Sequence, residues 1–191
     1  MVILGLLPAD AVKKIRADQL NKKITQLMEQ YGNEVLRIAY LYVRDRQRAE
    51  DVFQEVYLKA YKSYDRFKGK SSEKTWLIRI TINACKDMLR NPWYKRVIPF
   101  LNAPAYQIPT HDPADTIIAT EEQKQLFVAV LNLDVIFKDV IILYYYEQLG
   151  TQEMASMLGV AEGTVRSRLH RAREQLKHIL TKRGESIGST Q

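Results

Sequence analysis

The sequence predicts an all-α fold: two small helical domains joined by a proline-rich linker, the second containing a helix-turn-helix. Apolar residues recur at helical spacing, few segments alternate β-branched with polar residues, and only 8 of the 191 residues are glycine. Five of the six prolines fall between Pro92 and Pro113, where they interrupt helix and favour extended backbone. Five segments are therefore expected: an unassigned N-terminal segment (1–23), a first domain (24–91), the linker (92–120), a second domain (121–183) and a flexible tail (184–191).

Three helices are expected in the first domain. The first covers residues 24–43 and has Gly32 as its weak point, because glycine is a poor helix former. The second runs from about Arg48 to Tyr64. The third covers residues 75–91 and follows a loop over residues 67–74.

The two faces of the second helix differ in chemistry. Apolar residues at helical spacing make the expected buried face, which comprises Ala49, Val52, Phe53, Val56 and Ala60. The opposite face is an acidic patch around an exposed leucine, made of Asp51, Gln54, Glu55 and Leu58. An acidic patch on a protein of net charge +7 is poorly suited to DNA. The exposed leucine at its centre favours a protein partner. A merely solvated face is the alternative.

The third helix has an apolar and a polar side. Its apolar side comprises Leu77, Ile78, Thr81, Ala84, Cys85 and Met88. Cys85 is the only cysteine, which excludes an internal disulfide, fits a reducing cytoplasm and makes an inert core residue the best interpretation. The polar side carries Trp76, Arg79, Asn83, Lys86, Asp87 and Arg90. This strip offers base stacking, hydrogen bonds to base edges and phosphate contacts. Trp76 at the edge of the core is the alternative.

A short helix, a glycine turn and a basic helix follow one another in the second domain. Thr151 is the expected N-cap of the short helix, Glu153 lies in its first turn, and Gly159 is suited to end it. The next helix has a narrow apolar stripe, made of Val165, Leu169, Ala172 and Leu176. Seven Lys or Arg against one acid from Thr164 to Arg183 favour a helix-turn-helix that binds DNA. A structural helical hairpin shares the pattern.

Several functional classes are disfavoured. No apolar run approaches the ~20 residues of a transmembrane helix. The opening MVILGLLPA lacks a basic n-region and contains Pro8, so a cytoplasmic protein without membrane insertion is expected. The three histidines lie in the linker or the basic helix, and no carboxylates have metal-ligand spacing. We therefore expect no metal, no cofactor and no catalytic residues, hence no enzyme.

Three segments resemble the extracytoplasmic-function group of bacterial RNA polymerase sigma factors. AEDVFQEVYLKAY (49–61) is similar to the group's polymerase-binding segment, and FKGKSSEKTWLIRITINACKDMLR (67–90) to its −10 segment. VIILYYYEQLGTQEMASMLGVAEGTVRSRLHRARE (140–174) is similar to its −35 domain. The chain departs from the usual pattern in having Asp134 for proline, Ala161 for a capping Ser or Thr, and Lys74 for an aromatic residue.

The resemblance implies specific roles. The −35 element would be contacted by Thr164, Arg166, Ser167, His170, Arg171 and Arg173. The −10 element would be recognised and melted by Gly69, Lys70, Ser71, Ser72, Trp76, Arg79, Asn83, Lys86, Asp87 and Arg90, with a flipped base held in the loop from Gly69 to Glu73. Core polymerase would be bound by Asp51, Gln54, Glu55 and Leu58.

The resemblance also implies partners. These are promoter DNA, the clamp helices of the largest subunit of core RNA polymerase, the flap of the second-largest, and an anti-sigma factor. The linker would thread towards the active centre. No Lys or Arg occurs in it from Val97 to Thr120, which avoids adhesion to template and transcript; a plain spacer is the alternative.

A helix-turn-helix regulator that binds duplex DNA without polymerase is the main alternative function. It would account for the second domain but leave the acidic face and the Trp76 strip without a role. A nuclease or recombinase is a further alternative, but the sequence contains no cluster of catalytic residues that supports it.

Overall fold

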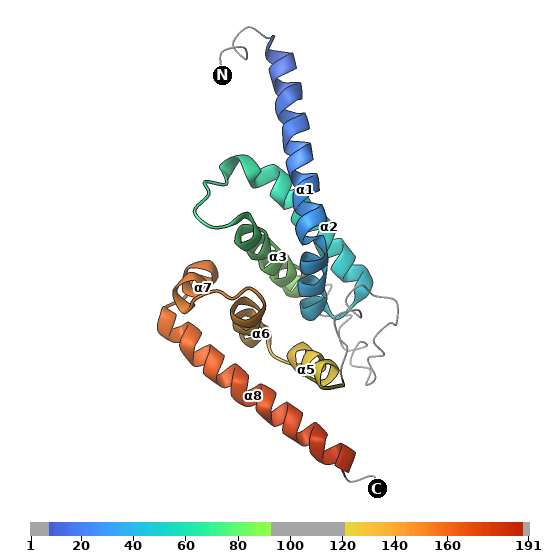
Figure 1. Ribbon diagram of the computed structural model, residues 1–191, viewed down its shortest axis with the longest axis vertical. Helices are drawn as coiled ribbons and strands as arrows, with labels where there is room; N and C mark the ends of the chain where they lie inside the picture. The colour runs from blue at the N-terminus through green and yellow to red at the C-terminus, as the bar shows by residue number, and fades with distance from the viewer. Residues whose placement is uncertain (1–7, 93–120, 189–191) are drawn as a thin grey trace.

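The computed structural model describes residues 8–92 and 121–188, and every regular element in these ranges is a helix (Figure 1). This confirms the all-α prediction. The linker expected over residues 92–120 lies outside the described residues, apart from its first residue. No described helix is long and apolar enough to span a membrane.

The first domain is a three-helix unit. It consists of α1 (Ala9–Val43), α2 (Arg46–Ser63), the short 3-10 turn η2 (Tyr64–Arg66) and α3 (Glu73–Arg90). Side chains with at most 1% exposure, among them Leu27, Val35, Val52, Leu77 and Ile78, form the core between the helices. Burial of these apolar groups is the main stabilising contribution to the unit.

α1 begins at Ala9, so the expectation of a helix from residue 24 was wrong by four turns. Apolar periodicity starts near Leu20, whereas the preceding residues include many good helix formers that leave no apolar stripe. Gly32 does not interrupt α1. A Cβ atom at that position would lie 3.4 Å from the Phe53 ring of α2, which is an ordinary van der Waals contact.

Local capping explains where these helices begin and end. Arg44 adopts the left-handed conformation, with φ of 57°, and ends α1. The side chain of Asp45 then accepts from the Arg48 N–H at 2.9 Å and starts α2. The Ser72 hydroxyl accepts from the Thr75 N–H at 3.0 Å and starts α3.

The second domain contains α5 (Glu121–Leu131), α6 (Val135–Ile141), the π-helical turn η4 (Ile142–Tyr146), α7 (Thr151–Leu158) and the long α8 (Glu162–Gly188). Its core forms where α5, α6 and α7 pack along one side of α8 (Figure 1). α8 continues through residues 184–188, where the sequence predicted the start of a tail. Residues 189–191 lie outside the described residues.

Candidate nucleic-acid and polymerase interfaces

The helix-turn-helix consists of α7, a turn at Gly159 and the first half of α8. Gly159 has φ of 67°, the left-handed conformation expected for the residue that ends α7. Val165, Leu169 and Ala172 are 0–4% exposed, so the predicted stripe of α8 packs into the domain. Leu176 is only half-buried. The basic side of α8 is therefore left facing solvent.

Thr151 does not cap α7 as expected, because Gly150 occupies the N-cap position. The Glu153 carboxylate instead accepts from the Gly150 N–H at 3.0 Å. The Thr151 hydroxyl donates to Glu162 Oε1 at 2.6 Å, which ties the start of α7 to the start of α8. This bond holds α8 where Ala161 supplies no side-chain cap.

Four of the predicted −35 residues lie together on the outer side of α8. Arg166, Ser167, His170 and Arg171 are all exposed, whereas Thr164 is half-buried and its carbonyl accepts from the Ser167 hydroxyl at 3.0 Å. Arg166 donates to Glu162 at 2.8 Å, and hydrogen bonds from Thr151 and then Arg166 lower the pKa of that carboxyl. Among the residues that the structure describes, the polar contacts of these side chains lie within the helix-turn-helix.

Arg173 is separated from this group. Its Nε donates to the Tyr145 hydroxyl at 2.9 Å, and its guanidinium lies 5.3 Å from the Tyr144 ring centre and 5.7 Å from that of Tyr145. The sequence analysis did not single out these tyrosines, although Tyr144, Tyr145 and Tyr146 are consecutive. Arg173 therefore packs on η4 rather than joining the outer face of α8.

The polar side of α3 lies on the first domain as the helical period predicts. Arg79, Asn83, Asp87 and Arg90 are exposed, and Asp87 accepts from Lys59 of α2 at 3.3 Å. Ile82 is buried on the other side, although the prediction omitted it, and Met88 is only half-buried. Cys85 is fully buried and burial raises the pKa of its thiol, as an inert core cysteine requires.

Trp76 belongs to an aromatic cluster at the edge of the core. Its ring centre lies 5.1 Å from that of Phe67 and 5.8 Å from that of Tyr64. Trp76 is half-buried, so it supports the neighbouring loop while part of its surface reaches solvent.

The loop between η2 and α3 is exposed and contains one left-handed residue. Gly69 has φ of 66°, and Lys70 and Ser71 are exposed. Ser72 is exposed as well, but its hydroxyl serves the α3 cap. Glu73 accepts from Tyr64 at 2.5 Å and pairs with Lys23 of α1 at 2.8 Å, which anchors the end of the loop.

The acidic face of α2 is exposed. Asp51, Gln54 and Glu55 surround Leu58, whose exposed fraction of 55% is the highest among the large apolar side chains described. The opposite face is buried as predicted, except that Phe53 is half-buried and Tyr57 is buried in addition. The fold therefore presents an exposed apolar side chain with acidic and amide neighbours on one side and Tyr61 and Lys62 on the other. An apolar centre with polar surroundings is typical of a protein interface.

Comparison with known proteins identifies the family. Residues 27–94 match the family model of Sigma-70 region 2, and residues 122–176 match that of Sigma-70, region 4. An ECF RNA polymerase sigma-E factor of Haemophilus influenzae is 33% identical over 173 residues, which cover 85% of this chain and 90% of that protein. The chain belongs to the extracytoplasmic-function sigma factors. It is thus a sigma subunit of RNA polymerase that directs promoter-specific initiation of transcription.

Other relatives agree with this assignment. The ECF sigma factor SigW of Bacillus subtilis is 28% identical, over 81% of this chain and 87% of that protein. The sigma factor RpoE of Bartonella quintana, solved in complex with the anti-sigma factor NepR, has a similar fold. Its TM-score is 0.66 at 24% identity, covering 84% of this chain and 98% of that chain.

Regions 2 and 4 of this sigma factor contact each other through buried polar groups. Asp139 of α6 is 2% exposed, accepts from the Tyr42 hydroxyl at 2.5 Å and pairs with Lys86 at 2.6 Å. The neighbouring Lys138 donates to the Leu41 carbonyl at 2.8 Å, and burial lowers its pKa to about 7. Lys86, a predicted −10 residue, is therefore engaged by region 4.

A second polar contact joins the regions at Lys74, the position where the chain departs from the usual aromatic residue. Lys74 pairs with Glu34 of α1 and with Glu147 of region 4, each at 3.2 Å. The other carboxylate oxygen of Glu147 is buried without a hydrogen-bond partner. Burial, with Glu34 nearby, raises the pKa of Glu147 to about 6.

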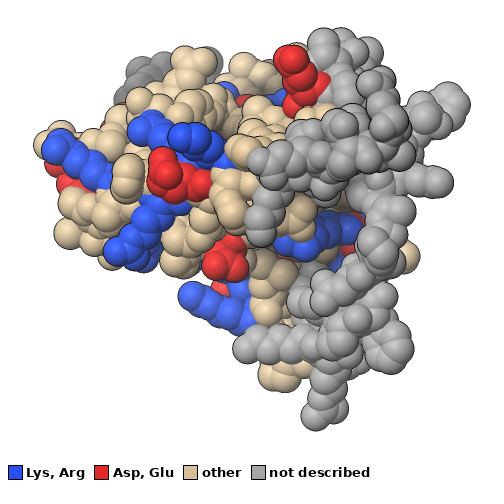
Figure 2. Space-filling view, turned by 90° about the horizontal axis from the view of Figure 1, so that it is seen from below, with Lys and Arg blue, Asp and Glu red and all other residues tan. Residues whose placement is uncertain are grey.

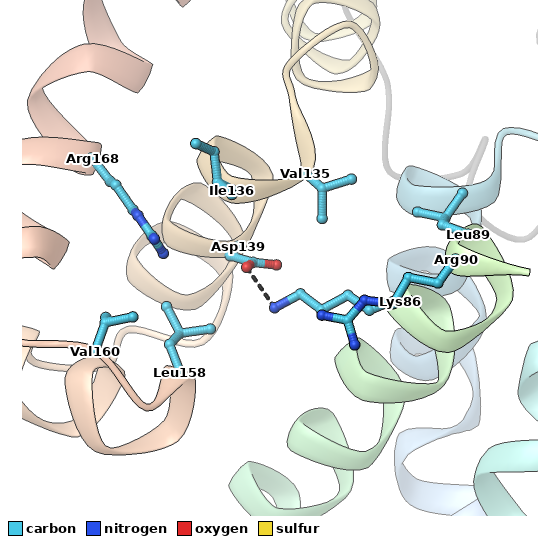
Figure 3. Close-up of a pocket in the computed structure, with 9 residues that line it drawn as sticks. All are labelled: Lys86, Leu89, Arg90, Val135, Ile136, Asp139, Leu158, Val160 and Arg168. Carbon is cyan, nitrogen blue, oxygen red and sulfur yellow. Dashed lines mark ion pairs between the residues drawn. The ribbon is translucent and has the colours of Figure 1, made fainter.

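A cleft of about 360 Å³ lies beside the pair of Lys86 and Asp139. Figure 3 shows Lys86 reaching Asp139 with Arg90 beside it, while Arg168 enters from α8 on the other side. The remaining lining is mainly apolar, from Leu89, Val135, Ile136, Leu158 and Val160. A second hollow of about 420 Å³ lies on region 4 between α5, α6, η4 and α8, and is lined mostly by apolar side chains.

The face of the molecule seen in Figure 2 carries no single patch of one charge. On the face shown in Figure 2, Lys and Arg side chains are dispersed with acidic side chains between them. Among the described residues, no group of three or more His, Cys, Asp and Glu side chains is arranged to hold a metal ion.

Proposed function

We propose that this sigma factor recognises the −35 element with α8 and the −10 element with α3 and the loop before it, while α2 docks on core polymerase. The observation that carries this proposal is the separation of charge between helices: α8 presents cations outward, whereas α2 presents acids around Leu58. A protein that bound only duplex DNA would have no use for an exposed acidic and apolar face.

Recognition of the −35 element falls to the outer side of α8. Arg166 and Arg171 are suited to guanine edges or phosphates, and Ser167 and His170 lie between them on the same exposed side. Arg166 would exchange its pair with Glu162 for a DNA contact. Arg173 would act differently, by holding Tyr144 and Tyr145 in place beside α8.

Recognition of the −10 element falls to the exposed part of α3. Asn83 offers a donor and an acceptor for a base edge, and Arg79 and Arg90 offer phosphate contacts. The loop around Gly69 would receive a flipped base, next to the cluster of Tyr64, Phe67 and Trp76. Unstacking a base costs a few kcal/mol, so melting needs such a receiving site.

An Asn83→Ala substitution tests this assignment. The preferred base downstream should change while the −35 preference stays fixed, as measured by permanganate footprinting on promoter variants. An unchanged downstream preference would remove Asn83 from the assignment.

Polymerase would hold the sigma factor at two places. The acidic face of α2 fits the basic surface expected on the clamp helices of the largest subunit. The apolar hollow on region 4, rimmed by the exposed Leu126 and Tyr145, fits the flap of the second-largest subunit. An anti-sigma factor is a further proposed partner, since the similar RpoE was solved in complex with one.

The contacts between regions 2 and 4 have a consequence for this function. Lys86 can reach DNA only after it leaves Asp139, so the two regions would separate when the protein joins polymerase and a promoter. The lost ion pair would be replaced by phosphate contacts.

Run-off transcription with core polymerase on genomic fragments tests the proposed function. Promoter-specific transcripts that require the added protein are expected. The alternative function, a regulator that binds duplex DNA alone, predicts that the protein does not cosediment with core polymerase and yields no such transcripts.

A further inference from the structure

The first third of α1 projects beyond the domain to which it belongs. The earliest residue of α1 that packs on the core is Leu20, and the first fully buried one is Ile24. The helix nevertheless begins at Ala9, so about 16 Å of it extends past the packed part. Figure 1 shows this end of α1 rising above α2 and α3.

This overhang carries its charges on two opposite strips. Lys14, Asp18 and Lys22 follow one another at intervals of four residues, so on that strip an acid lies between two bases. On the opposite strip, Lys13, Arg16, Leu20 and Lys23 lie at intervals of three and four residues, without an acid among them. Asp10 lies one turn from Lys13, and no acid lies three or four residues from Arg16. We call this second set the Lys13 strip.

The Lys13 strip is oriented by contacts at its lower end. Lys23 pairs with Glu73 at 2.8 Å, at the point where the loop enters α3. The pKa of Glu73 is lowered by Lys23 first and by Tyr64 second, so the pair is charged at neutral pH. Leu20 packs against the core on the same side. Arg16 and Lys13 therefore lie about 10 and 15 Å further along the axis, on the side of the loop.

The loop below the strip is itself basic and aromatic. Lys68 and Lys70 are exposed on it and Arg66 is exposed at the end of η2, next to the aromatic cluster that includes Phe67 and Trp76. Positive side chains beside aromatic rings are the usual combination for a single-stranded nucleic acid. In the described chain, Lys13 and Arg16 extend this surface and have no acidic partner in contact.

We infer that the Lys13 strip is a second DNA-binding site, which holds the phosphates of the single strand leaving the −10 loop. This inference rests on the proposed function, because the loop must first hold the strand. Contacts of this kind carry no base preference and would slow the reclosing of the melted DNA. A solvated helix and a docking surface for polymerase are the alternatives that an experiment must separate.

Two double charge reversals of equal size provide the test. K13E/R16E reverses the Lys13 strip, and K14E/K22E makes the same change on the opposite side of the same helix. Each variant is assembled with core polymerase and bound to two forked promoter fragments. The non-template strand ends directly after the −10 element in one, and continues as a single strand in the other.

On the continued strand, K13E/R16E should shorten the half-life under competitor challenge about tenfold and reduce the salt slope by about 1.4, for two single-strand phosphate contacts. On the shortened fork it should behave as wild type, and K14E/K22E should behave as wild type on both. K13Q/R16Q should give a smaller loss with unchanged helicity, which excludes unfolding of the overhang as the cause.

Other outcomes overturn the inference. Equal loss on both forks, equal loss in K14E/K22E, or no loss at all would remove the site. Weaker binding of K13E/R16E to core polymerase in native gels would assign the strip to a protein interface. Failure of the proposed function appears separately, as wild-type holoenzyme that does not distinguish −10 sequences even on the shortened fork.

Discussion

The two surfaces proposed to recognise the promoter differ in how far they are already engaged. The outer residues of α8 contact only their own helix-turn-helix, as in the pair of Arg166 with Glu162. On α3, Lys86 is held by Asp139 of the other region, and Asp87 by Lys59 of α2. The −35 surface is therefore free in this conformation, whereas the −10 surface is partly occupied.

This difference shows that facing outward on a helix is not the same as being available. Both sets of residues occupy the polar sides that the helical period assigns to them. Region 4 covers only one of the two sets, because α6 packs against the ends of α1 and α3 through Lys138 and Asp139. If both surfaces recognise the promoter as proposed, Lys86 must first separate from Asp139.

The largest expected effect comes from abolishing the binding of the sigma factor to core polymerase, since use of either promoter-recognition surface in transcription depends on that binding. Glu55→Arg places a cation on the exposed acidic face of α2, against a basic partner, and should cost several kcal/mol of affinity for core polymerase. Stability should change by no more than about 0.5 kcal/mol, because Glu55 is exposed. Sedimentation with purified core and thermal melting measure the two quantities.

Glu29→Arg is the matched control, since Glu29 is exposed on the solvent side of α1. It should bind core polymerase as wild type does. If Glu55→Arg also keeps full affinity, the argument for a polymerase interface on α2 is lost.

The next effect tests the free surface. Arg171→Ala and Arg166→Ala should each weaken binding to the −35 element by about 1–3 kcal/mol where a bidentate base contact is lost. Arg173→Ala provides the contrast: it removes contacts with Tyr145 and Tyr144, so the preference among −35 bases should persist. Binding isotherms on upstream duplexes at moderate salt measure this, and wild-type transcription by the first two variants would contradict it.

The engaged surface is tested by Asp139→Ala. Without this carboxylate, the buried Tyr42 hydroxyl and Lys86 lose their shared partner, at a cost of about 1–3 kcal/mol to the contact between the regions. Fluorescence energy transfer between labels on the two regions should fall, and the free protein should bind −10 single-stranded DNA more tightly. An unchanged distance would show that the contact does not limit access to α3.

The sequence predicted which sides of α2, α3 and α8 face outward, because a helical wheel depends only on local geometry. It correctly assigned Val52, Val56 and Leu169 to the buried sides of their helices and Leu58 and Arg171 to the exposed sides. It also correctly predicted that α7 ends at Gly159, which has the left-handed conformation. The overhang of α1 was missed, since a helix without an apolar face leaves no periodic signal.

Contacts between regions were outside the reach of sequence patterns. Lys86 and Asp139 are 53 residues apart, and nothing in either segment shows that they meet. Thr151 is a similar case. The sequence predicts that it caps α7, but in the fold its hydroxyl donates a hydrogen bond to Glu162 of the following helix. Such pairings depend on how whole helices pack, which the period of one helix does not determine.

The smallest expected effect is a pH dependence of the contact at Lys74. The pKa of Glu147 is raised from its ordinary 4.5 to about 6, first by burial and then by Glu34, against the opposing effect of Lys74. A raised carboxyl pKa means that closing the regions binds a proton. The stability that Glu147 contributes to the contact between the regions is therefore complete below pH 4.5. It is lost as the pH rises through about 6, and the total loss is about 1–2 kcal/mol.

Glu147→Gln isolates this contribution, because the amide resembles the protonated carboxyl and does not titrate. Lys138, with a pKa of about 7, also begins to titrate towards pH 7, but it does so in the variant and in the wild type alike. Other carboxyls titrate in both proteins, so the quantity to measure is the difference in melting temperature and in energy transfer between Glu147→Gln and wild type. That difference should be near zero at pH 4.5 and should favour the variant at pH 7. A constant difference across this range would mean that Glu147 is not desolvated by the contact between regions 2 and 4.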